Sequence, residues 1–266
     1  MVIRCSGVMV RRAGRTILGP IDWVVRSGER WIVLGRNGSG KTTLLSVASM
    51  NLWPSAGVVE VLGERYGRTD ARDLRRRVGM AGSAVEDAMR PDLTPHDLIM
   101  TARHGAYEPW WHVYTAADRA RATAIGERLG LGSHLHQPFS TLSAGERRRT
   151  SIARALMPDP DILFLDEPTA SLDLAARETL LHDLAALART SRPTAIVLVS
   201  HHLEEIPPGF GHVLVLAEGR VAAAGPIHDV LRDDVLSDAF GLSLVVEARD
   251  GRWTARRRPG GSHPRG

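Results

Sequence analysis

One short segment has residue types and spacing suited to binding phosphate groups: Gly35-Arg36-Asn37-Gly38-Ser39-Gly40-Lys41-Thr42-Thr43. It fits the pattern G-x-x-x-x-G-K-[ST], in which glycines let successive backbone N–H groups turn towards phosphate oxygens. An apolar run at 31–34 precedes it and a helical run at 44–48 follows, so the positive end of a helix would lie behind the phosphates. Lys41 would then reach the β- and γ-phosphates, and the Thr42 hydroxyl would bind Mg²⁺. The sequence therefore predicts a nucleoside triphosphate site.

Lys41 is the only lysine in the sequence, although the chain has 34 basic residues. Every other basic residue is an arginine. An ammonium group on a flexible stem is compact, and a planar guanidinium cannot replace it in a tight loop. The retained lysine favours a phosphate-binding role over an accidental glycine-rich turn.

Two further buried strands are predicted to end in polar side chains. The apolar run at 162–165 ends in Asp166-Glu167, and the run at 195–199 ends in Ser200-His201-His202. In an open α/β sheet, ligands bind at the carboxyl ends of the strands, and carboxylates placed there beside a phosphate loop hold Mg²⁺. A plain strand ending in a polar turn is the alternative for either run. The phosphate loop favours the functional interpretation.

Composition places the chain among soluble globular proteins, with 43% hydrophobic and 24% charged residues in 266. The apolar runs are too short to span a bilayer, and the first residues lack the layout of a secretory signal. A single cysteine, Cys5, excludes an internal disulfide and suits a reducing cytosol. The net charge of +4 is mild, and arginines gather near the carboxyl terminus. That end is expected to be a basic disordered tail over 249–266, most simply a solvated one without a specific partner.

The periodicity predicts an α/β fold. Short alternating runs within 2–25 indicate antiparallel strands ahead of the phosphate loop. Thr94-Pro95 and Thr115 are helix-start signals in a block with few strand signals. We expect a P-loop NTPase core with a mostly parallel sheet, amino-terminal antiparallel strands and an inserted helical subdomain. One domain is expected over 1–248, with the core at about 1–83 and 158–235 and the subdomain at about 84–157.

Four aromatic residues fall within eight positions of the predicted subdomain: Tyr107, Trp110, Trp111 and Tyr114. They could form an exposed docking patch for a partner, or they could pin an irregular loop to the helices. Both interpretations stay open at this stage. His134 and His136 could suggest a metal pair, but no third ligand lies nearby in the sequence, so a metal site is not favoured.

Five motifs stand in one order: the phosphate loop, 142–146 (Leu-Ser-Ala-Gly-Glu), 162–167, 171–173 (Ser-Leu-Asp) and 200–201. Together they resemble the nucleotide-binding ATPase domain of ABC transporters over roughly residues 2–235, and the Leu-Ser-x-Gly motif discriminates this family from other P-loop enzymes. The resemblance implies hydrolysis of ATP with Mg²⁺. It also implies that two copies sandwich two ATP molecules head to tail, so that each site is completed by the other subunit.

The resemblance also implies a role for each matched position. Asp166 would coordinate Mg²⁺ together with Thr42, and Glu167 would be the general base for the attacking water. His201 would contact the γ-phosphate. From the second copy, Ser143 and Gly145 would donate to the same phosphate, and Asp173 would lie at the joint between the two sites.

Three positions depart from the family pattern. Arg12 stands by spacing where an aromatic residue usually stacks on adenine, and a guanidinium plane can also stack on a base. Ser83 stands where a glutamine normally couples the site to the membrane subunits. Ala144 and Glu146 replace a commoner Gly and Gln, which the motif should tolerate.

These observations favour a cytoplasmic ATPase subunit, peripheral on the inner face of the cell membrane, that works with a transmembrane permease. Its carboxyl-terminal region, including Phe240-Gly241, loosely resembles ATPases associated with iron-complex and siderophore uptake. The alternative is a free-standing ABC-type ATPase with a regulatory or nucleic-acid-linked role, which Ser83 and the basic carboxyl terminus favour. Nucleic acid is otherwise an unlikely partner. A P-loop kinase would leave 142–146 without a role.

Overall fold

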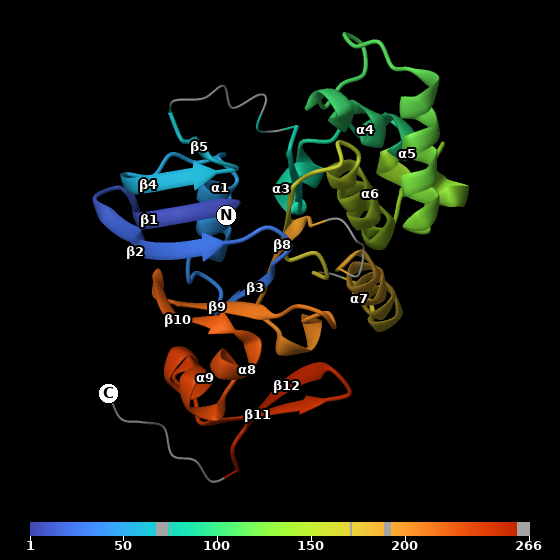
Figure 1. Ribbon diagram of the computed structural model, residues 1–266. Helices are drawn as coiled ribbons and strands as arrows, with labels where there is room; N and C mark the ends of the chain where they lie inside the picture. Colours follow the sequence, from blue (N-terminus) through green and yellow to red (C-terminus); the bar gives the residue numbers. More distant parts are fainter. Residues whose placement is uncertain (68–73, 75, 171, 189–192, 260–266) are drawn as a thin grey trace. The chain divides into compact units, whose positions relative to one another are not determined.

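The computed structural model describes residues 1–67, 74, 76–170, 172–188 and 193–259. The chain folds into two compact units, one formed by Met1–Thr69 with Leu184–Gly266 and the other by Asp70–Asp183 (Figure 1). The fold class is α/β, as the periodicity predicts. No helix among the described residues has both the length and the hydropathy needed to cross a membrane.

The first unit contains strands in the order β10-β9-β3-β8, of which β3, β8 and β9 are largely buried. Strand β3 (Arg30–Gly35) runs parallel to β8 (Ala195–Ser200) on one side and to β9 (His212–Ala217) on the other. Strand β10 (Arg220–Pro226) is antiparallel to β9. All six residues of β8 are buried, as expected where both faces of a parallel sheet are covered. This explains why β3 and β8 read as continuous apolar runs.

An antiparallel sheet in the same unit has the order β2-β1-β4-β5 (Figure 1). Its strands are β1 (Ile3–Arg12), β2 (Arg15–Val25), β4 (Ala56–Val61) and β5 (Glu64–Arg65). The second half of β2 alternates buried and exposed residues, which places one face on the core and the other in solvent. Helix α1 (Lys41–Ala48) packs against strands of both sheets. The predicted antiparallel strands are therefore present.

The carboxyl-terminal part of the first unit is folded further than the sequence suggests. After α8 (Ile227–Val230) and α9 (Asp233–Phe240), strands β11 (Leu244–Arg249) and β12 (Arg252–Arg257) form an antiparallel hairpin. The prediction of a disordered tail from residue 249 is therefore wrong for 249–257. Residues 260–266 lie outside the described part.

Helix α9 provides the partners that order this hairpin. The Asp233 carboxylate accepts from the backbone N–H of Val246 at 2.7 Å and from the Arg258 guanidinium at 2.7 Å. The Ser237 hydroxyl accepts from the backbone N–H of Leu244 at 2.9 Å. Composition does not reveal these partners, because they lie 7 to 25 residues away in the sequence.

The second unit joins two parallel strands, β6 (Val78–Ala81) and β7 (Ile162–Asp166), to a set of helices. These are α3 (Ser83–Asp87), α4 (Pro95–Thr101), α5 (Ala116–Arg128), α6 (Ala144–Leu156) and the first part of α7 (Leu174–Ala188). Single 3₁₀ turns fall at η1 (Ala102–His104), η2 (Gly132–His134) and η3 (Phe139–Thr141). This unit therefore contains β6 and β7 as well as the helices, and it is larger than a purely helical subdomain. The expected limits of the helical subdomain, 84 and 157, stay a prediction.

Two helix starts in this unit are the ones that the sequence predicts. Thr94 caps α4 by accepting from the N–H of Asp97, with Pro95 at the first helical position. Thr115 caps α5 in a reciprocal capping box with Asp118. An apolar cluster that includes Leu98, Phe139 and Leu142 then fixes the segment leading into α6. Residue 142 begins the Leu-Ser-Ala-Gly-Glu motif, so this cluster anchors that motif.

Candidate nucleotide-binding site

The phosphate loop joins β3 to α1, and its shape requires glycine at particular positions. Gly35 has φ +158°, and a Cβ atom there would lie 2.4 Å from the carbonyl oxygen of Leu216 and 2.5 Å from Oγ of Ser39. Gly38 and Gly40 have φ +80° and +100°, values that residues with a side chain rarely adopt. The glycine spacing of the sequence motif therefore corresponds to real backbone turns.

Lys41 is folded back over its own loop. Its Nζ donates to the carbonyl oxygen of Gly35 at 2.9 Å and to that of Arg36 at 3.2 Å, and the residue is only 4% exposed. A buried ammonium is costly unless polar groups surround it. The loop carbonyls hold this charge at the amino-terminal end of α1, where phosphate oxygens are most favourably bound.

The loop is also tied to the turn between β9 and β10. The N–H of Gly219 donates to the carbonyl oxygen of Ser39 at 3.1 Å, and the N–H of Gly19 donates to that of Gly219 at 2.7 Å. A Cβ atom on Gly40 would approach Leu18 Cδ1 to 3.0 Å, so the loop lies close against β2. Two segments far apart in the sequence, β2 and the β9–β10 turn, thus support the phosphate-binding loop.

A pocket of about 500 Å³ opens beside this loop. Its walls come from the loop, from the β9–β10 turn and from the end of α9: Arg36, Asn37, Gly38, Ser39, Ala217, Glu218, Arg220, Asp238, Ala239, Phe240 and Gly241. The sequence motifs do not include the α9 residues. Gly241 ends α9 in a left-handed conformation, and a glycine of this kind is a helix-end signal in the sequence. Nothing in the sequence, however, places that helix end beside the phosphate loop.

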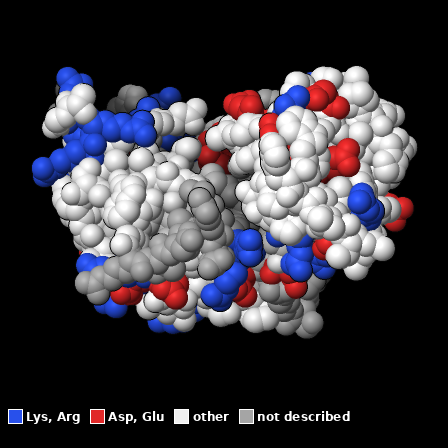
Figure 2. Space-filling model, turned by 90° about the horizontal axis from the view of Figure 1, so that it is seen from above, with Lys and Arg blue, Asp and Glu red and all other residues white. Residues whose placement is uncertain are grey.

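Arg12 lies at the exposed tip of the β1–β2 hairpin, paired across the strands with Arg15. Arg11 is exposed beside it. Figure 2 shows basic side chains gathered on the side of the molecule that carries β1, β2 and β4. Such a group of charges attracts polyphosphates from solution. Stacking of Arg12 on a base stays a prediction.

In the second unit, β7 ends at Asp166 and Glu167 follows, both half-buried. Glu167 has φ +46°, a left-handed conformation that costs a side-chain-bearing residue about 1–3 kcal/mol. Gly82, at the end of β6, allows close approach, since a Cβ atom there would lie 2.9 Å from Cβ of Asp166. Glu167 therefore lies on strained backbone, a feature that is common at functional sites.

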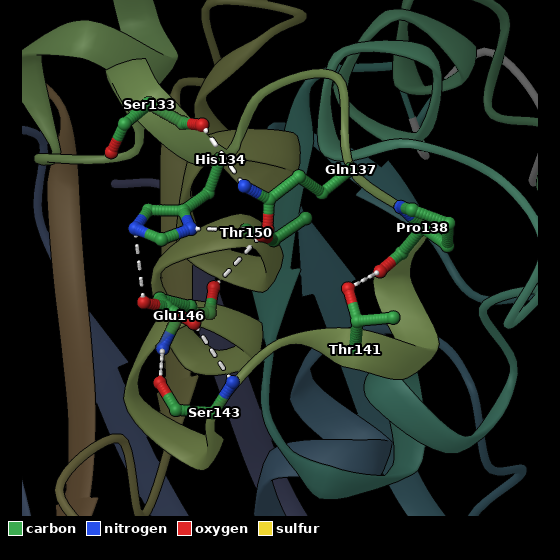
Figure 3. A network of polar contacts seen from close by, with 8 residues as sticks. All are labelled: Ser133, His134, Gln137, Pro138, Thr141, Ser143, Glu146 and Thr150. Atoms are coloured by element: carbon green, nitrogen blue, oxygen red, sulfur yellow. Dashed lines mark hydrogen bonds and ion pairs between the residues drawn. The ribbon is translucent and has the colours of Figure 1, made fainter.

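The Leu-Ser-Ala-Gly-Glu motif forms the amino-terminal end of α6 (Figure 3). The Glu146 carboxylate accepts from the backbone N–H of Ser143 at 2.8 Å, and Oγ of Ser143 accepts from the N–H of Glu146 at 3.4 Å. Ser143 remains exposed. The reciprocal capping box fixes the first turn of the helix. Ser143 and Gly145 therefore lie on a rigid, solvent-facing helix end, the kind of site that binds anions.

His134, from η2, is part of the same network (Figure 3). Its Nε2 lies 3.3 Å from Oε1 of Glu146, and its Nδ1 lies 3.4 Å from Oε1 of Gln137. Burial acts to raise the pKa of Glu146, but the hydrogen bonds from Ser143 and the charge of His134 lower this pKa below its usual value. The carboxylate is therefore held in its charged form. No pattern in the sequence indicates that His134 contacts this motif.

The other predicted site residues lie at the ends of helices or strands. Asp173 caps the start of α7, accepting from the N–H of Ala176 at 2.8 Å, while Ser171 lies outside the described residues. His201 follows the last residue of β8, and its ring lies against that of His202 with 4.1 Å between centroids. Ser83 is exposed and begins α3. The phosphate loop, Arg12 and His201 thus belong to the first unit, and the remaining predicted site residues belong to the second.

The four aromatic residues at 107–114 differ in burial, which separates the two interpretations, an exposed docking patch and packing that pins the loop. Tyr114 is buried, and Tyr107 lies under the buried Arg154 with 4.2 Å from the guanidinium carbon to the ring centre. Trp110 is covered in part by Arg90 at 4.6 Å. Trp111 is 84% exposed. The contacts of the two tyrosines therefore support pinning of the loop, and a docking role stays open for the two exposed tryptophans.

The phosphate loop and the α/β fold define a P-loop NTPase. The family model for the ABC transporter matches residues 18–170. The chain is 36% identical over 249 residues to the uncharacterized ABC transporter ATP-binding protein YlmA of Bacillus subtilis, covering 92% of this chain and 93% of the relative. It is 33% identical to the hemin import ATP-binding protein HmuV of Rhodococcus jostii, covering 92% and 82%. This chain belongs to the ABC transporter family, as an ATP-binding protein.

Solved structures agree on the fold. A putative metal-chelate type ABC transporter in an inward-facing conformation gives a TM-score of 0.75 at 22% identity, covering 96% of each chain. The dimeric bacterial ABC transporter cassette MJ0796 also gives 0.75 at 22% identity, covering 85% of this chain and 98% of the cassette. At this level of identity the likeness establishes the architecture alone.

Proposed function

We propose that this protein hydrolyses ATP to power an ABC-type membrane importer, acting as a head-to-tail dimer. The observation that carries the proposal is the phosphate loop, where Lys41 is buried over Gly35 and Arg36 at the start of α1. Such a loop has little purpose other than binding a nucleotide polyphosphate. Family membership supports ATP as that nucleotide.

Magnesium suits the donors that the chain offers. The exposed Thr42 hydroxyl and the Asp166 carboxylate are hard oxygen ligands of the kind that Mg²⁺ prefers. The ion, when bound, neutralises charge that develops on the phosphate oxygens. Lys41 adds a fixed positive charge to the same phosphates. Glu167 orients and deprotonates the attacking water, and His201 contacts the γ-phosphate.

The second copy completes each site in this proposal. Ser143 and Gly145 offer a hydroxyl and an N–H at the exposed start of α6, and Asp173 lies at the joint. Phosphoryl transfer depends on positioning and charge neutralisation more than on covalent chemistry, so donors from a partner can control turnover. ATP then closes the dimer, hydrolysis reopens it, and the motion drives the permease.

For the cargo, we propose a metal chelate of the hemin or siderophore type. Support comes from the HmuV relative, named for hemin import, and from the structural likeness to a metal-chelate type transporter. The protein would then sit in the cytoplasm against the permease at the inner face of the membrane. Fractionation tests this placement: copurification with a permease is expected, and a protein found only free of membranes would count against it.

The reaction itself is tested by Glu167→Gln. We expect ATP binding to persist, turnover to fall by about 10²–10⁴-fold, and an ATP-bound dimer to accumulate in gel filtration. Lys41→Ala should lose turnover and weaken ATP binding together. Glu127→Gln, an exposed change on α5, is the matched control and should behave as wild type. Unchanged hydrolysis by Glu167→Gln would refute the assigned base.

The alternative is a free-standing ATPase that does regulatory or nucleic-acid-linked work. Ser83 favours it, because the family's coupling glutamine is absent from that position. The exposed arginines of β12 supply a basic surface. Binding of nucleic acid that weakens steeply with salt would support this function, and absence of binding at low salt would leave the transporter as the better proposal.

A further inference from the structure

The turn that carries His201 is held by a buried hydroxyl on one side. Ser200, the last residue of β8, is fully buried, and its Oγ accepts from the backbone N–H of His202 at 2.9 Å. The same hydroxyl donates to Oε2 of Glu205. A hydroxyl with a charged acceptor and a backbone donor has its orientation fixed. The residues on both sides of His201 are therefore joined through one oxygen atom.

Glu205 is the unusual member of this group. It belongs to the short turn η4 (Leu203–Glu205) and is only 5% exposed. A buried carboxylate destabilises a fold unless polar groups compensate it, and packing alone would be better served by an apolar side chain. Its bond to Ser200 uses that carboxylate to connect η4 with the turn at His201.

The carboxyl-terminal hairpin reaches the same turn from outside. The guanidinium of Arg252, on β12, donates to the carbonyl oxygen of Glu204 at 2.7 Å, and β12 packs along η4. The hairpin is itself fastened to α9 through Asp233, and the end of α9 lines the pocket beside the phosphate loop. The end of α9 thus lies at the phosphate-loop pocket, while β12 lies against η4, close in sequence to His201.

We propose that Glu205 and Arg252 are positioning residues for His201. Glu205 acts by fixing Ser200, and Arg252 acts by holding η4 in place. This inference rests on the proposed function, in which His201 contacts the γ-phosphate. A displacement of about 1 Å at a positioned catalytic group can cost roughly 100-fold in rate, so two remote contacts can control turnover.

The first experiment measures kcat, KM for ATP and binding of a non-hydrolysable ATP analogue in purified variants. Glu205→Ala is expected to lower kcat by about 10–100-fold while KM and analogue affinity stay within about twofold of wild type. Glu205→Gln keeps an acceptor oxygen of the same shape and should recover most of the rate. If Glu205→Ala fails to fold, as thermal unfolding would reveal, the Arg252 comparison below carries the test.

Arg252→Ala should lower kcat by about 3–10-fold, and Arg256→Ala is its matched control. Arg256 lies on the same strand and pairs with Glu247 at an exposed ion pair, so its removal should leave kcat unchanged. Equal kcat for Arg252→Ala, Arg256→Ala and wild type would overturn the role of the hairpin.

The second experiment combines each change with His201→Ala. If Glu205 and Arg252 act through His201, they cause no further loss of kcat in that background. Losses that multiply would mean that the contacts act on turnover independently of His201, and would overturn the inference. If His201→Ala alone retains full activity, the assigned role of His201 in the proposed function fails instead. The two failures are therefore distinguishable.

Discussion

Replacement of Gly35 by alanine tests the backbone geometry of the phosphate loop. The added Cβ would lie 2.4 Å from the Leu216 carbonyl oxygen and 2.5 Å from Oγ of Ser39. The first of these atoms is part of strand β9 and cannot turn aside as a flexible side chain can. Gly38, in the same loop, is the matched control, since its Cβ would meet nothing within 4 Å although φ is +80°.

The two substitutions separate backbone strain from steric overlap. Both place a side chain on an unfavourable backbone conformation, at a cost of about 1–3 kcal/mol. Only Gly35→Ala adds overpacking against neighbouring atoms, which typically costs a further 1–3 kcal/mol or so. We therefore expect Gly35→Ala to be less stable than Gly38→Ala by about 2 kcal/mol.

Urea unfolding followed by circular dichroism measures the difference, provided that the slope with denaturant is the same in both variants. The urea midpoint should be highest for wild type, lower for Gly38→Ala and lowest for Gly35→Ala. If the free energies of unfolding of the two variants agree within about 0.5 kcal/mol, the steric argument for Gly35 is refuted.

Two further predictions concern pH. The pKa of Glu146 is lowered, so its carboxylate stabilises the fold above pH 4.5 and loses this effect as pH falls through the folded pKa. Glu146→Gln should therefore lower the free energy of unfolding by about 0.5–1 kcal/mol near neutral pH. Unfolding experiments in acid should show no difference between this variant and wild type. The Asp97 carboxylate, which faces the His96 ring as an acceptor, raises the pKa of His96. The stabilisation that His96 contributes is therefore present below pH 6.5 and disappears as pH rises through the folded pKa. Titration of the His96 ring by NMR should give a pKa above 6.5, and a lower value would contradict the pairing.

Much of the site is local in the sequence and could be predicted from it. The phosphate loop needs only a strand, a glycine-rich turn and a helix in succession, and its geometry follows from glycines at fixed spacing. The starts of α4 and α5 are likewise set by Thr94 and Thr115, whose caps involve residues three positions away. Interactions of this range leave a signal in a short window of sequence.

Other contacts join residues that no local pattern relates. The arginine-rich carboxyl terminus resembles a disordered tail by composition, but Asp233 and Ser237 on α9 pair with it and order a hairpin. The contact between His134 and Glu146 similarly depends on how η2 packs against α6. These features required the folded chain, because each partner is supplied by a separate element.

By itself, the sequence determined the nucleotide-binding class of this protein and predicted which loop holds the phosphates, since nine consecutive residues contain that chemistry. Tertiary structure alone decided that the end of α9 forms a wall beside that loop and that Arg252 reaches the turn carrying His201. The physical reason is the separation along the sequence between the residues that interact. A phosphate loop is built from neighbouring backbone groups, whereas the support of a catalytic side chain comes from whichever distant elements the core brings against it.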